Sequence, residues 1–428
     1  MKKLFAVAVL SAAGLTQTAL MQSPPSHRAK SYVIEVEVDS FDRVTTAIER
    51  SGTIVLNSNR DLSTISVETA DPAAFGRMPG VHDVRPDIEV RAISTGQPST
   101  GSPSRNLTMI KAADADLASA NNGARSDGAG WAVVVIDDGI DAGHPYLSDA
   151  QGRSRVIAEA CRTNRNCAGG TSRADGPGSA RHTGNSWHGT HVAGIVAGDS
   201  RGGQPSIPRG VARAADIMAV NVFESNGSAL GSNVDAALQW TLEKKRAGAK
   251  IASVNLSFTS LVLYPNNCDS SSPTTKRLID ELSKEGVVVV TASGNAGSRN
   301  GTTWPACLSN ILPVASIANS LQVSTESNVS PVISTQGLLA PGQSICSSVN
   351  RTRATSGYGC TNGTSMAAPH VAGAVALLRQ KAPNLPVSQI LGAIRTTPNT
   401  INDTRPRGTV SGLKVLDVAA ALAALPSS

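Results

Sequence analysis

The stretch VVVIDDGID, residues 133–141, indicates the fold class of this 428-residue chain. Its apolar residues run directly into Asp137, which is typical of a buried parallel strand with a polar group at its C-terminal end. Similar buried-strand patterns recur downstream with helical patterns between them, at 216–223, 251–258, 287–293 and 311–317. This alternation predicts an α/β fold built on a doubly wound, mostly parallel sheet.

Two later blocks present residues suited to acyl-transfer chemistry. HGTHVAG begins at His188, and NGTSMAAPHVAG carries Ser365. In each block a turn of small residues precedes a helix-like stretch, where backbone N–H groups lack partners. A serine hydroxyl needs a base to act as a nucleophile, and an aspartate such as Asp137 can hold that imidazole in the correct tautomer. The chain order Asp, His, Ser differs from the orders found on other folds with this triad.

The chain resembles the subtilisin-like serine proteases. The likeness rests on Asp137 in IDDGID, His188 in HGTHVAG, Ser365 in GTSMAAP and a fourth block, TASGNAG, around Asn295. It implies a subtilisin-like peptidase domain over residues 106–428, with the Asp, His and Ser as catalytic residues. It also implies that the Asn295 side-chain amide stabilises the oxyanion, with the backbone N–H of Ser365 as second donor.

The resemblance also suggests where the substrate pocket lies. Its walls are expected at Asn255, Leu256 and Ser257, where relatives often have S-L-G-G, and at Ala292, Ser293 and Gly294. Neither wall contains an acid, so we expect an uncharged, mostly apolar residue before the cut bond. The family usually has Ser or Thr after the catalytic Asp, whereas this chain has Asp138. Two adjacent acids could raise the proton affinity of one of them.

The N-terminus reads MKKLFAVAVLSAAGLTQTAL, two lysines followed by an interrupted apolar stretch. This pattern predicts a secretory signal over residues 1–22, cut between about Gly14 and Ser23. The stretch is too short and too broken for a spanning helix, and no later stretch is long and apolar enough to cross a membrane. We therefore expect a secreted protein, extracellular or periplasmic, without a membrane span.

Residues 29–92 have the pattern of a separate small unit. SYVIEVEV alternates like a half-buried strand, DRVTTAIERSG indicates a helix, and TIVLNS, STISVET and VHDVRPDIEV follow as strands around a small helical piece. This order predicts a ferredoxin-like α+β unit. It resembles the inhibitory propeptide that precedes many subtilisin-like domains, although a generic small domain or a binding module would show the same pattern. Residues 93–105, rich in Ser, Gly and Pro, have the composition of an exposed linker.

Six cysteines in an exported chain favour disulfides over free thiols. Six cysteines allow fifteen pairings. Their positions fall into neighbouring couples, which predicts the pairs Cys161–Cys167, Cys268–Cys307 and Cys346–Cys360. A zinc site is the competing interpretation, but the chain has no CxxC pair and no neighbouring His at ligand spacing.

No metal is expected in the site, and the chemistry requires no cofactor. His188 and His191 stand three apart rather than four, and the Glu of an HExxH motif is absent between them. A structural calcium has no D-x-D-x-D-G run to support it. In many relatives an acid that helps to bind calcium follows His-Pro, whereas Tyr146 follows His144-Pro145 here.

The formal net charge is +6, and Lys244-Lys245-Arg246 is the only tight basic cluster. A solvated surface accounts for this charge, so no nucleic-acid partner is expected. The expected partners are protein or peptide substrates and the chain's own propeptide, and we expect a monomer. An esterase is disfavoured because G-x-S-x-G is missing and the triad order is wrong for that fold. An inactive protease-like binding protein should have lost a triad residue, and this chain keeps all three. The sequence therefore predicts a secreted serine endopeptidase that acts through an acyl-enzyme and is made as a self-inhibited precursor.

Overall fold

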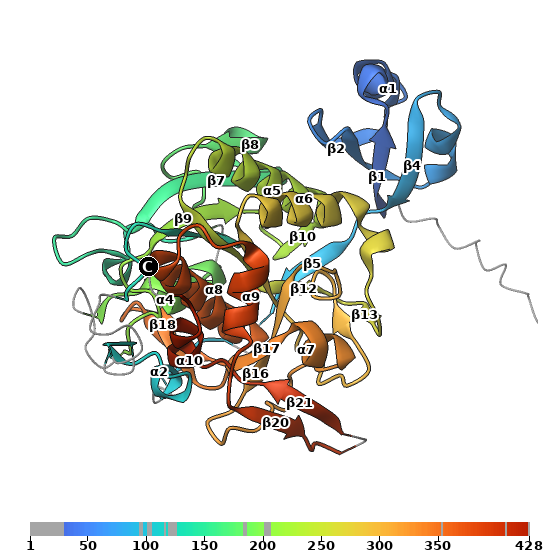
Figure 1. Ribbon diagram of the computed structural model, residues 1–428. Coiled ribbons are helices and arrows are strands. Elements are labelled where there is room, and N and C mark those ends of the chain that lie inside the picture. Colours follow the sequence, from blue (N-terminus) through green and yellow to red (C-terminus); the bar gives the residue numbers. More distant parts are fainter. Residues whose placement is uncertain are drawn as a thin grey trace, which may run out of the picture.

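The computed structural model describes residues 30–93, 97–100, 105–114, 117–118, 126–182, 186–200, 207–351, 354–406 and 409–426. The expected signal peptide and much of the expected linker lie outside these residues. The described residues form two units, which we call the N-terminal unit (residues 30–86) and the large unit (residues 105–426). Figure 1 shows the N-terminal unit at one end of the molecule, with a strand that leads from it into the large unit.

The N-terminal unit is an antiparallel sheet in the order β2-β3-β1-β4. Its elements are β1 (Lys30–Val36), η1 (Val38–Ser40), α1 (Phe41–Arg50), β2 (Ile54–Asn59), β3 (Thr64–Thr69), η2 (Pro72–Arg77) and β4 (Val81–Pro86). Val44 and Ile48 stand four apart on α1 and pack on Ile34 and Ile65 of the sheet. The order of strands and helices agrees with the sequence prediction, with a short 3-10 helix in the second helical position.

The stretch VHDVRPDIEV was expected to form one final strand, and this expectation was wrong. β4 ends at Pro86, which has no backbone N–H with which to continue the ladder. The chain then leaves the N-terminal unit, and β5 (Glu89–Ala92) joins a different sheet. In that sheet β5 lies between β10 (Ser228–Leu230) and β12 (Phe258–Ser260) of the large unit, antiparallel to both.

An eight-stranded sheet forms the centre of the large unit, in the order β17-β16-β14-β11-β6-β9-β7-β8. Every pairing in it is parallel except that of β7 with β8. Its strands are β6 (Ala132–Asp137), β7 (Val156–Cys167), β8 (Thr171–Asp175), β9 (Asp216–Asn221), β11 (Ile251–Leu256), β14 (Val288–Ala292), β16 (Leu312–Ile317) and β17 (Leu338–Pro341). The predicted α/β class and mostly parallel sheet are confirmed.

Helices cover both faces of this sheet, as Figure 1 shows. Alternate residues of β6 point to opposite faces, so Val133 and Val135 join one apolar core while Val134 and Ile136 join another. The first core includes residues of α4, α8, α9 and α10, and the second includes residues of α5 and α6. The helices are α2 (Asn106–Met109), α4 (His188–Ala197), α5 (Gly231–Arg246), α6 (Pro273–Lys284), α7 (Pro331–Gln336), α8 (Thr364–Lys381), α9 (Val387–Ile394) and α10 (Val418–Ala423).

Three small two-stranded antiparallel sheets and several 3-10 turns complete the large unit. They are β13 (Leu263–Tyr264) with β15 (Thr302–Thr303), β18 (Ile345–Ser348) with β19 (Tyr358–Thr361), β20 (Thr400–Asp403) with β21 (Val410–Lys414), and η3 (Pro145–Leu147), η4 (Ala168–Gly170) and η6 (Asp269–Ser271). In the part of the chain that the structure describes, no helix combines the length and apolar character needed to cross a membrane.

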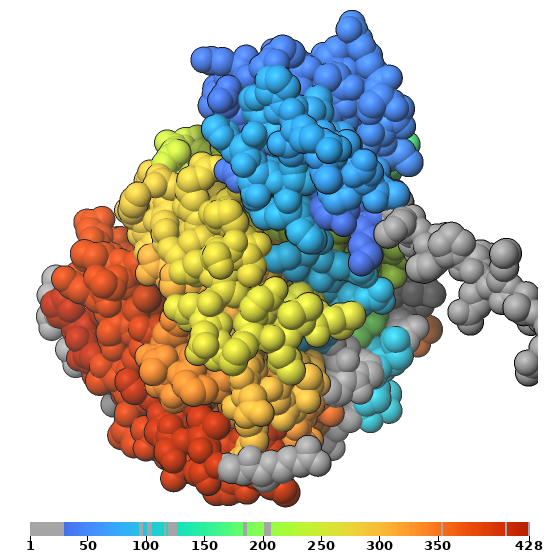
Figure 2. All heavy atoms as spheres, turned by 90° about the vertical axis from the view of Figure 1, so that its right-hand side faces the viewer, coloured from blue at the N-terminus to red at the C-terminus, as the bar shows by residue number. Residues whose placement is uncertain are grey.

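The N-terminal unit rests directly on the large unit, as the blue atoms in Figure 2 show. Leu62, in the turn between β2 and β3, is buried in the second core of the large unit. Asp87 accepts a hydrogen bond from the backbone N–H of Ser232 in the first turn of α5, at 3.1 Å. The two units are therefore joined by side-chain contacts as well as by β5.

Candidate active site

Asp137 and His188 meet because one ends a strand and the other begins a helix. Asp137 is the last residue of β6 and His188 the first of α4, and the His188 Nδ1 lies 2.8 Å from the Asp137 Oδ1. Both side chains are almost fully buried. Burial alone would lower the pKa of His188, but Asp137, Asp138 and the backbone of Ile93 outweigh it and raise this pKa above its ordinary value. The pair is therefore built to stabilise an imidazolium.

Asp138 lies at the N-terminus of α4. Its carboxylate accepts the backbone N–H of Gly189 at 2.7 Å and that of His188 at 3.2 Å, so it satisfies two donors that a helix start leaves free. Burial, followed by the charge of Asp137, raises the pKa of Asp138 to about 7. Asp138 stands where the family usually has Ser or Thr, and it thus adds a second acid beside the Asp137–His188 pair. Its carboxylate binds the start of the helix that carries the imidazole.

Ser365 is the second residue of α8 and is fully buried. Its hydroxyl donates to the backbone oxygen of Ser257 at 2.9 Å, and the Ser257 hydroxyl donates back to the Ser365 backbone oxygen at 2.9 Å. The second bond matters because Pro369, four residues on, has no N–H to give to that oxygen. Because α8 begins at Thr364, Pro369 lies in its second turn.

The His188 Nε2 forms no hydrogen bond with Ser365, whose hydroxyl donates to the backbone oxygen of Ser257 instead. The Cα–Cβ bond of a serine can rotate between staggered rotamers of similar energy. Hydrogen bonds of catalytic groups are often formed only once substrate is bound. The helix α4, which begins with His188, packs against α8, which carries Ser365, and no hydrogen bond joins these two side chains.

Asn295 follows β14 in a turn that faces the start of α8. Its side-chain oxygen accepts both the backbone N–H and the hydroxyl of Thr364, at 2.9 Å and 2.8 Å. These two bonds fix the amide so that its N–H₂ points away from Thr364. The Nδ2 atom is buried and has no partner among the residues that the structure describes. A fixed, desolvated donor of this kind suits the stabilisation of a developing negative charge.

The chain's own β5 fills the groove beside these residues. Ala92 pairs with Phe258 and Val90 with Ser260, while on the other side Val90 pairs with Ala229. Ile93, the next residue, packs against the first core of the large unit. A Cβ atom placed on Gly363 would lie 2.7 Å from the Asn295 Nδ2 and 3.5 Å from the Ile93 backbone oxygen. The Ile93 carbonyl and the Asn295 amide thus both lie next to Gly363, and the backbone of Ile93 also raises the pKa of His188.

The expected pocket wall at 255–257 lies at the C-terminal end of β11 and just beyond it. Asn255 and Leu256 belong to β11 and are fully buried, and Leu256 packs in the second core of the large unit. The strand that pairs with β5 is β12, which begins at Phe258. Ser257 is the single residue between these two strands, and the assignment of Asn255, Leu256 and Ser257 to the pocket wall stays a prediction. Of the three residues only Ser257 contacts a candidate catalytic residue.

The other expected wall lies at the end of β14. Ala292, Ser293 and Gly294 are buried, and Gly294 adopts a φ of 109° next to Asn295. Sequence reasoning missed β10 and the pairing of Ser99 with Cys360 on the far side of Ile93. Neither is marked by a motif, because a strand edge that binds another strand uses backbone groups, which every sequence has.

The three disulfides are Cys161–Cys167, Cys268–Cys307 and Cys346–Cys360, the pairing expected from the sequence.

Two residues that the sequence raised in connection with metal sites are occupied by other contacts. The His191 Nε2 lies 3.1 Å from the backbone oxygen of Gly359, and burial lowers the pKa of His191 to about 3. Tyr146 is buried and donates its hydroxyl to the backbone oxygen of Pro208. Within the described ranges, no group of three or more His, Cys, Asp or Glu side chains could hold a metal ion.

Comparisons with known proteins agree with this geometry. The model of the subtilase family matches residues 128–411. Subtilisin DY from Bacillus licheniformis is 31% identical over 280 residues, which cover 64% of this chain and 86% of that protein. An alkaline protease from Shouchella clausii is 29% identical over 385 residues, covering 89% of this chain and 86% of the relative.

Among solved structures, fervidolysin from Fervidobacterium pennivorans is similar with a TM-score of 0.66 and 22% identity. The match covers 92% of this chain and 61% of fervidolysin, which is described as a keratinolytic enzyme related to subtilisin. At this identity the structural likeness establishes the fold, and the family model and the sequence relatives establish the family. The chain belongs to the subtilase family and is a serine endopeptidase.

Proposed function

We propose that this protein is a secreted endopeptidase with Asp137, His188 and Ser365 as its catalytic triad, made as a precursor that its own N-terminal unit inhibits. One observation carries the proposal. The segment that ends at Ile93 lies as a strand between β10 and β12, and its last carbonyl lies next to Gly363, as the Asn295 amide does. A chain segment in that position resembles a bound substrate, and the bond that follows Ile93 is the one presented for cutting.

In the proposed reaction the Ser365 Oγ turns toward His188 and attacks the carbonyl carbon of the substrate. The new C–O bond forms as the proton of the hydroxyl passes to the His188 Nε2, and Asp137 stabilises the imidazolium. The carbon–nitrogen bond then breaks, and the imidazolium gives its proton to the leaving amine. Water, activated by the same imidazole, hydrolyses the acyl-enzyme and releases the acid product. No cofactor enters any step.

The oxyanion of each tetrahedral intermediate would accept hydrogen bonds from the Asn295 Nδ2 and from the backbone N–H of Ser365. The orientation of the Asn295 amide supports this role, because Thr364 occupies its oxygen and leaves only the N–H₂ to face the cleft. A preorganised donor contributes more than a mobile one, since it needs no reorientation as charge develops.

The N-terminal unit would act as the inhibitor because β5 occupies the groove that a substrate needs. Residues 30–93 would then constitute the propeptide, and the new N-terminus would begin at Ser94. Ser99 forms two backbone hydrogen bonds with Cys360, both at 2.9 Å, so described residues lie on both sides of the proposed cut. The expected signal at 1–22 and the disulfides are consistent with export, and we propose a monomer that acts on proteins or peptides.

A covalent probe tests the catalytic assignment. A fluorophosphonate should label the processed protein once, and peptide mapping should place the label on Ser365. The matched control is Ser253→Ala, which removes another buried serine hydroxyl, one that donates to the backbone oxygen of Ala372 on α8, and should leave labelling in place. Labelling of any residue other than Ser365, or undiminished labelling of Ser365→Ala, would refute the proposed triad.

A further inference from the structure

The loop that carries Asn295 runs from Ser293 to Asn300, and we call it the oxyanion loop. It leaves β14 at the molecular surface, and Ala296 and Asn300 are exposed. A donor for the oxyanion must nevertheless be held within a fraction of an ångström of its productive position. Something other than burial of the loop itself must therefore fix its shape.

Asn328 supplies contacts of this kind from beneath the loop. Its side chain is fully buried, and its Oδ1 accepts the backbone N–H of Ala296 at 3.0 Å and that of Ser298 at 2.9 Å. Its Nδ2 donates to the backbone oxygen of Ser293 at 3.2 Å. One amide thus binds backbone groups on both sides of Asn295.

The main chain of Asn328 binds the same loop. Its N–H donates to the backbone oxygen of Gly294 at 2.8 Å, and its backbone oxygen accepts the Ser293 hydroxyl at 2.8 Å. A Cβ atom placed on Gly294 would lie 2.2 Å from the Asn328 Nδ2, and this glycine has a φ of 109°. Gly294 therefore has to be a glycine both for its backbone conformation and because the Asn328 amide fills the adjacent space.

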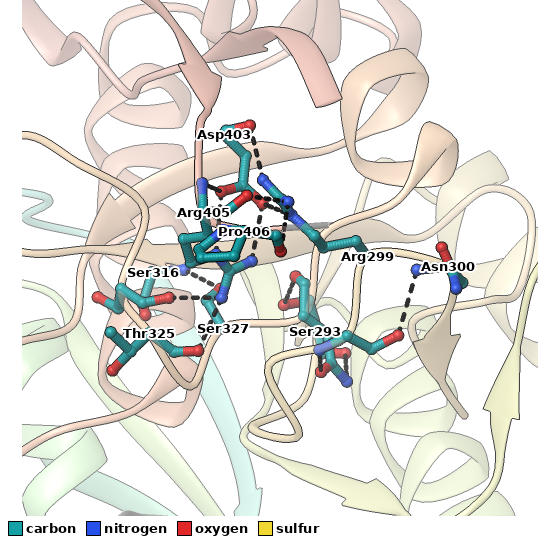
Figure 3. A network of polar contacts seen from close by, with 12 residues as sticks. Ser293, Arg299, Asn300, Ser316, Thr325, Ser327, Asp403, Arg405 and Pro406 are labelled. Atoms are coloured by element: carbon teal, nitrogen blue, oxygen red, sulfur yellow. Dashed lines mark hydrogen bonds and ion pairs between the residues drawn. The ribbon is translucent and has the colours of Figure 1, made fainter. Parts of the chain in front are cut away.

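A buried ion cluster braces the outer end of the loop (Figure 3). Arg299 donates to the Asp403 carboxylate at 2.8 Å and to backbone oxygens after β20. Arg405 binds the same carboxylate at 2.9 Å and the backbone oxygens of Ser324 and Thr325, in the segment that leads to Asn328. The Asp403 side chain is completely buried. The cluster ties the oxyanion loop and the Asn328 segment to one hairpin, β20–β21.

We propose that Asn328 is a positioning residue for the oxyanion hole, one that fixes the conformation of the oxyanion loop and so aims the amide of Asn295, with Arg299 and Asp403 holding the loop at its far end. The proposal rests on the proposed role of Asn295. Asn328 itself has no atom among the reacting groups, since its side-chain oxygen and nitrogen are both used by the loop backbone. It should therefore affect the chemical step rather than the binding of substrate.

The test is a double-mutant cycle on the full chain. Asn328→Ala should lower kcat by about 10- to 100-fold through misplacement of the donor, with KM changed less than about threefold. A peptide boronic acid, whose adduct with the serine is tetrahedral, should lose affinity by a similar factor. Asn295→Ala should cost about 10²- to 10³-fold in kcat. If Asn328 acts through Asn295, then Asn328→Ala should cost less than about threefold more in the Asn295→Ala background.

The first-order rate of cutting within the precursor gives a second readout that does not depend on KM. Thr241→Ala is the matched control, because it also removes a buried side-chain hydrogen bond but on α5, far along the chain from the loop. It should leave kcat unchanged. Arg299→Met, which keeps Asn328, tests the outer brace if Asn328→Ala fails to fold, and it should lower kcat by about three- to tenfold with KM unchanged.

The same penalty for Asn328→Ala in both backgrounds would overturn the proposal and leave the role of Asn295 intact. A rise in KM with kcat unchanged would also overturn it, because that pattern indicates altered ground-state binding. Full activity of Asn295→Ala would instead refute the oxyanion assignment, and the inference about Asn328 with it.

Discussion

The N-terminal unit and the large unit are stabilised by different means. The N-terminal unit has one core of eight buried apolar residues and contains no cysteine. The large unit has two extensive cores on the faces of its sheet and contains all three disulfides. Small cores leave little stability to spare, so the N-terminal unit depends more on its contacts with its partner. We therefore expect the large unit to be the more stable of the two and the N-terminal unit, the proposed inhibitor, to be the less stable.

The contacts between the units are few and specific. Arg85 donates to the hydroxyl of Thr274 at the start of α6, at 3.0 Å, while its other nitrogen binds Glu35 and Asp83. Asp87 meets the start of α5, where the dipole of the helix favours a negative charge. Together with Leu62 and β5, these residues form the joint between the two units.

Among these predictions, replacement of the proposed nucleophile of the large unit should have the largest effect. Ser365→Ala should lower kcat by about 10⁶-fold, because the acyl-enzyme can no longer form. Hydrolysis of a peptide amide by purified protein measures this loss. Residual activity within tenfold of the unchanged enzyme would contradict the proposed nucleophile.

Loss of a disulfide should destabilise one unit and not the other. Cys346 and Cys360 are paired residues of β18 and β19, and they close a loop with a sequence separation of 14. Replacing both with Ser should lower the free energy of unfolding of the large unit by about 3 kcal/mol. Denaturant titration in the Ser365→Ala background, which prevents self-digestion, measures this change. An equal loss in the transition of the N-terminal unit would show that the two units do not unfold independently.

Much of the large unit could be predicted because its signals are local. The apolar runs that became β6, β9, β11, β14 and β16 are short stretches of neighbouring residues, and the motif blocks lie at strand ends and helix starts. The joint could not be predicted, since Pro86 ends a strand whose pattern continues beyond it and since β5 finds its partners more than a hundred residues away. Asn328 carries no motif either, because its role depends on backbone groups that meet it only in the fold.

The residue before the proposed cut should have a smaller effect, which is on the rate at which the precursor is cut. Ile93 packs against the apolar core, and a charged side chain there would be buried without a known partner. Ile93→Arg should slow the cutting of the precursor by about tenfold or more, and a Leu or aromatic peptide amide should be cut faster than the matched Arg peptide. Faster cutting of the Arg peptide would mean that an acid, such as Glu224 or Asp269, reaches the pocket.

The pH dependence of the joint should be the smallest of these effects. Burial raises the pKa of Asp87, and burial together with Asp87 raises the pKa of Asp235 on α5 to about 7 from 3.8, against the opposing influence of Thr275, Arg85 and Arg277. The charge of Asp87 contributes to the raised pKa of Asp235 only while the two units are docked, so the docked state is favoured at low pH and this contribution is lost as pH rises toward about 7. The cut N-terminal unit should therefore leave several-fold faster at pH 8 than at pH 5.

Native mass spectrometry of the processed protein at the two pH values measures the docked fraction directly. Asp235→Asn is the control, since it cannot ionise and should remove most of the difference. Faster release at pH 5 than at pH 8 would contradict the assignment of these two carboxyl groups.

The most direct test of the central claim, that this enzyme cuts its own chain after Ile93, is the sequence of the N-terminus of the processed protein. The protein should be produced in a host that lacks other proteases, and the same measurement should be made on Ser365→Ala. The account predicts that the processed form begins at Ser94 and that Ser365→Ala remains joined through this bond. A processed form that begins elsewhere, or one that begins at Ser94 in Ser365→Ala as well, would contradict it.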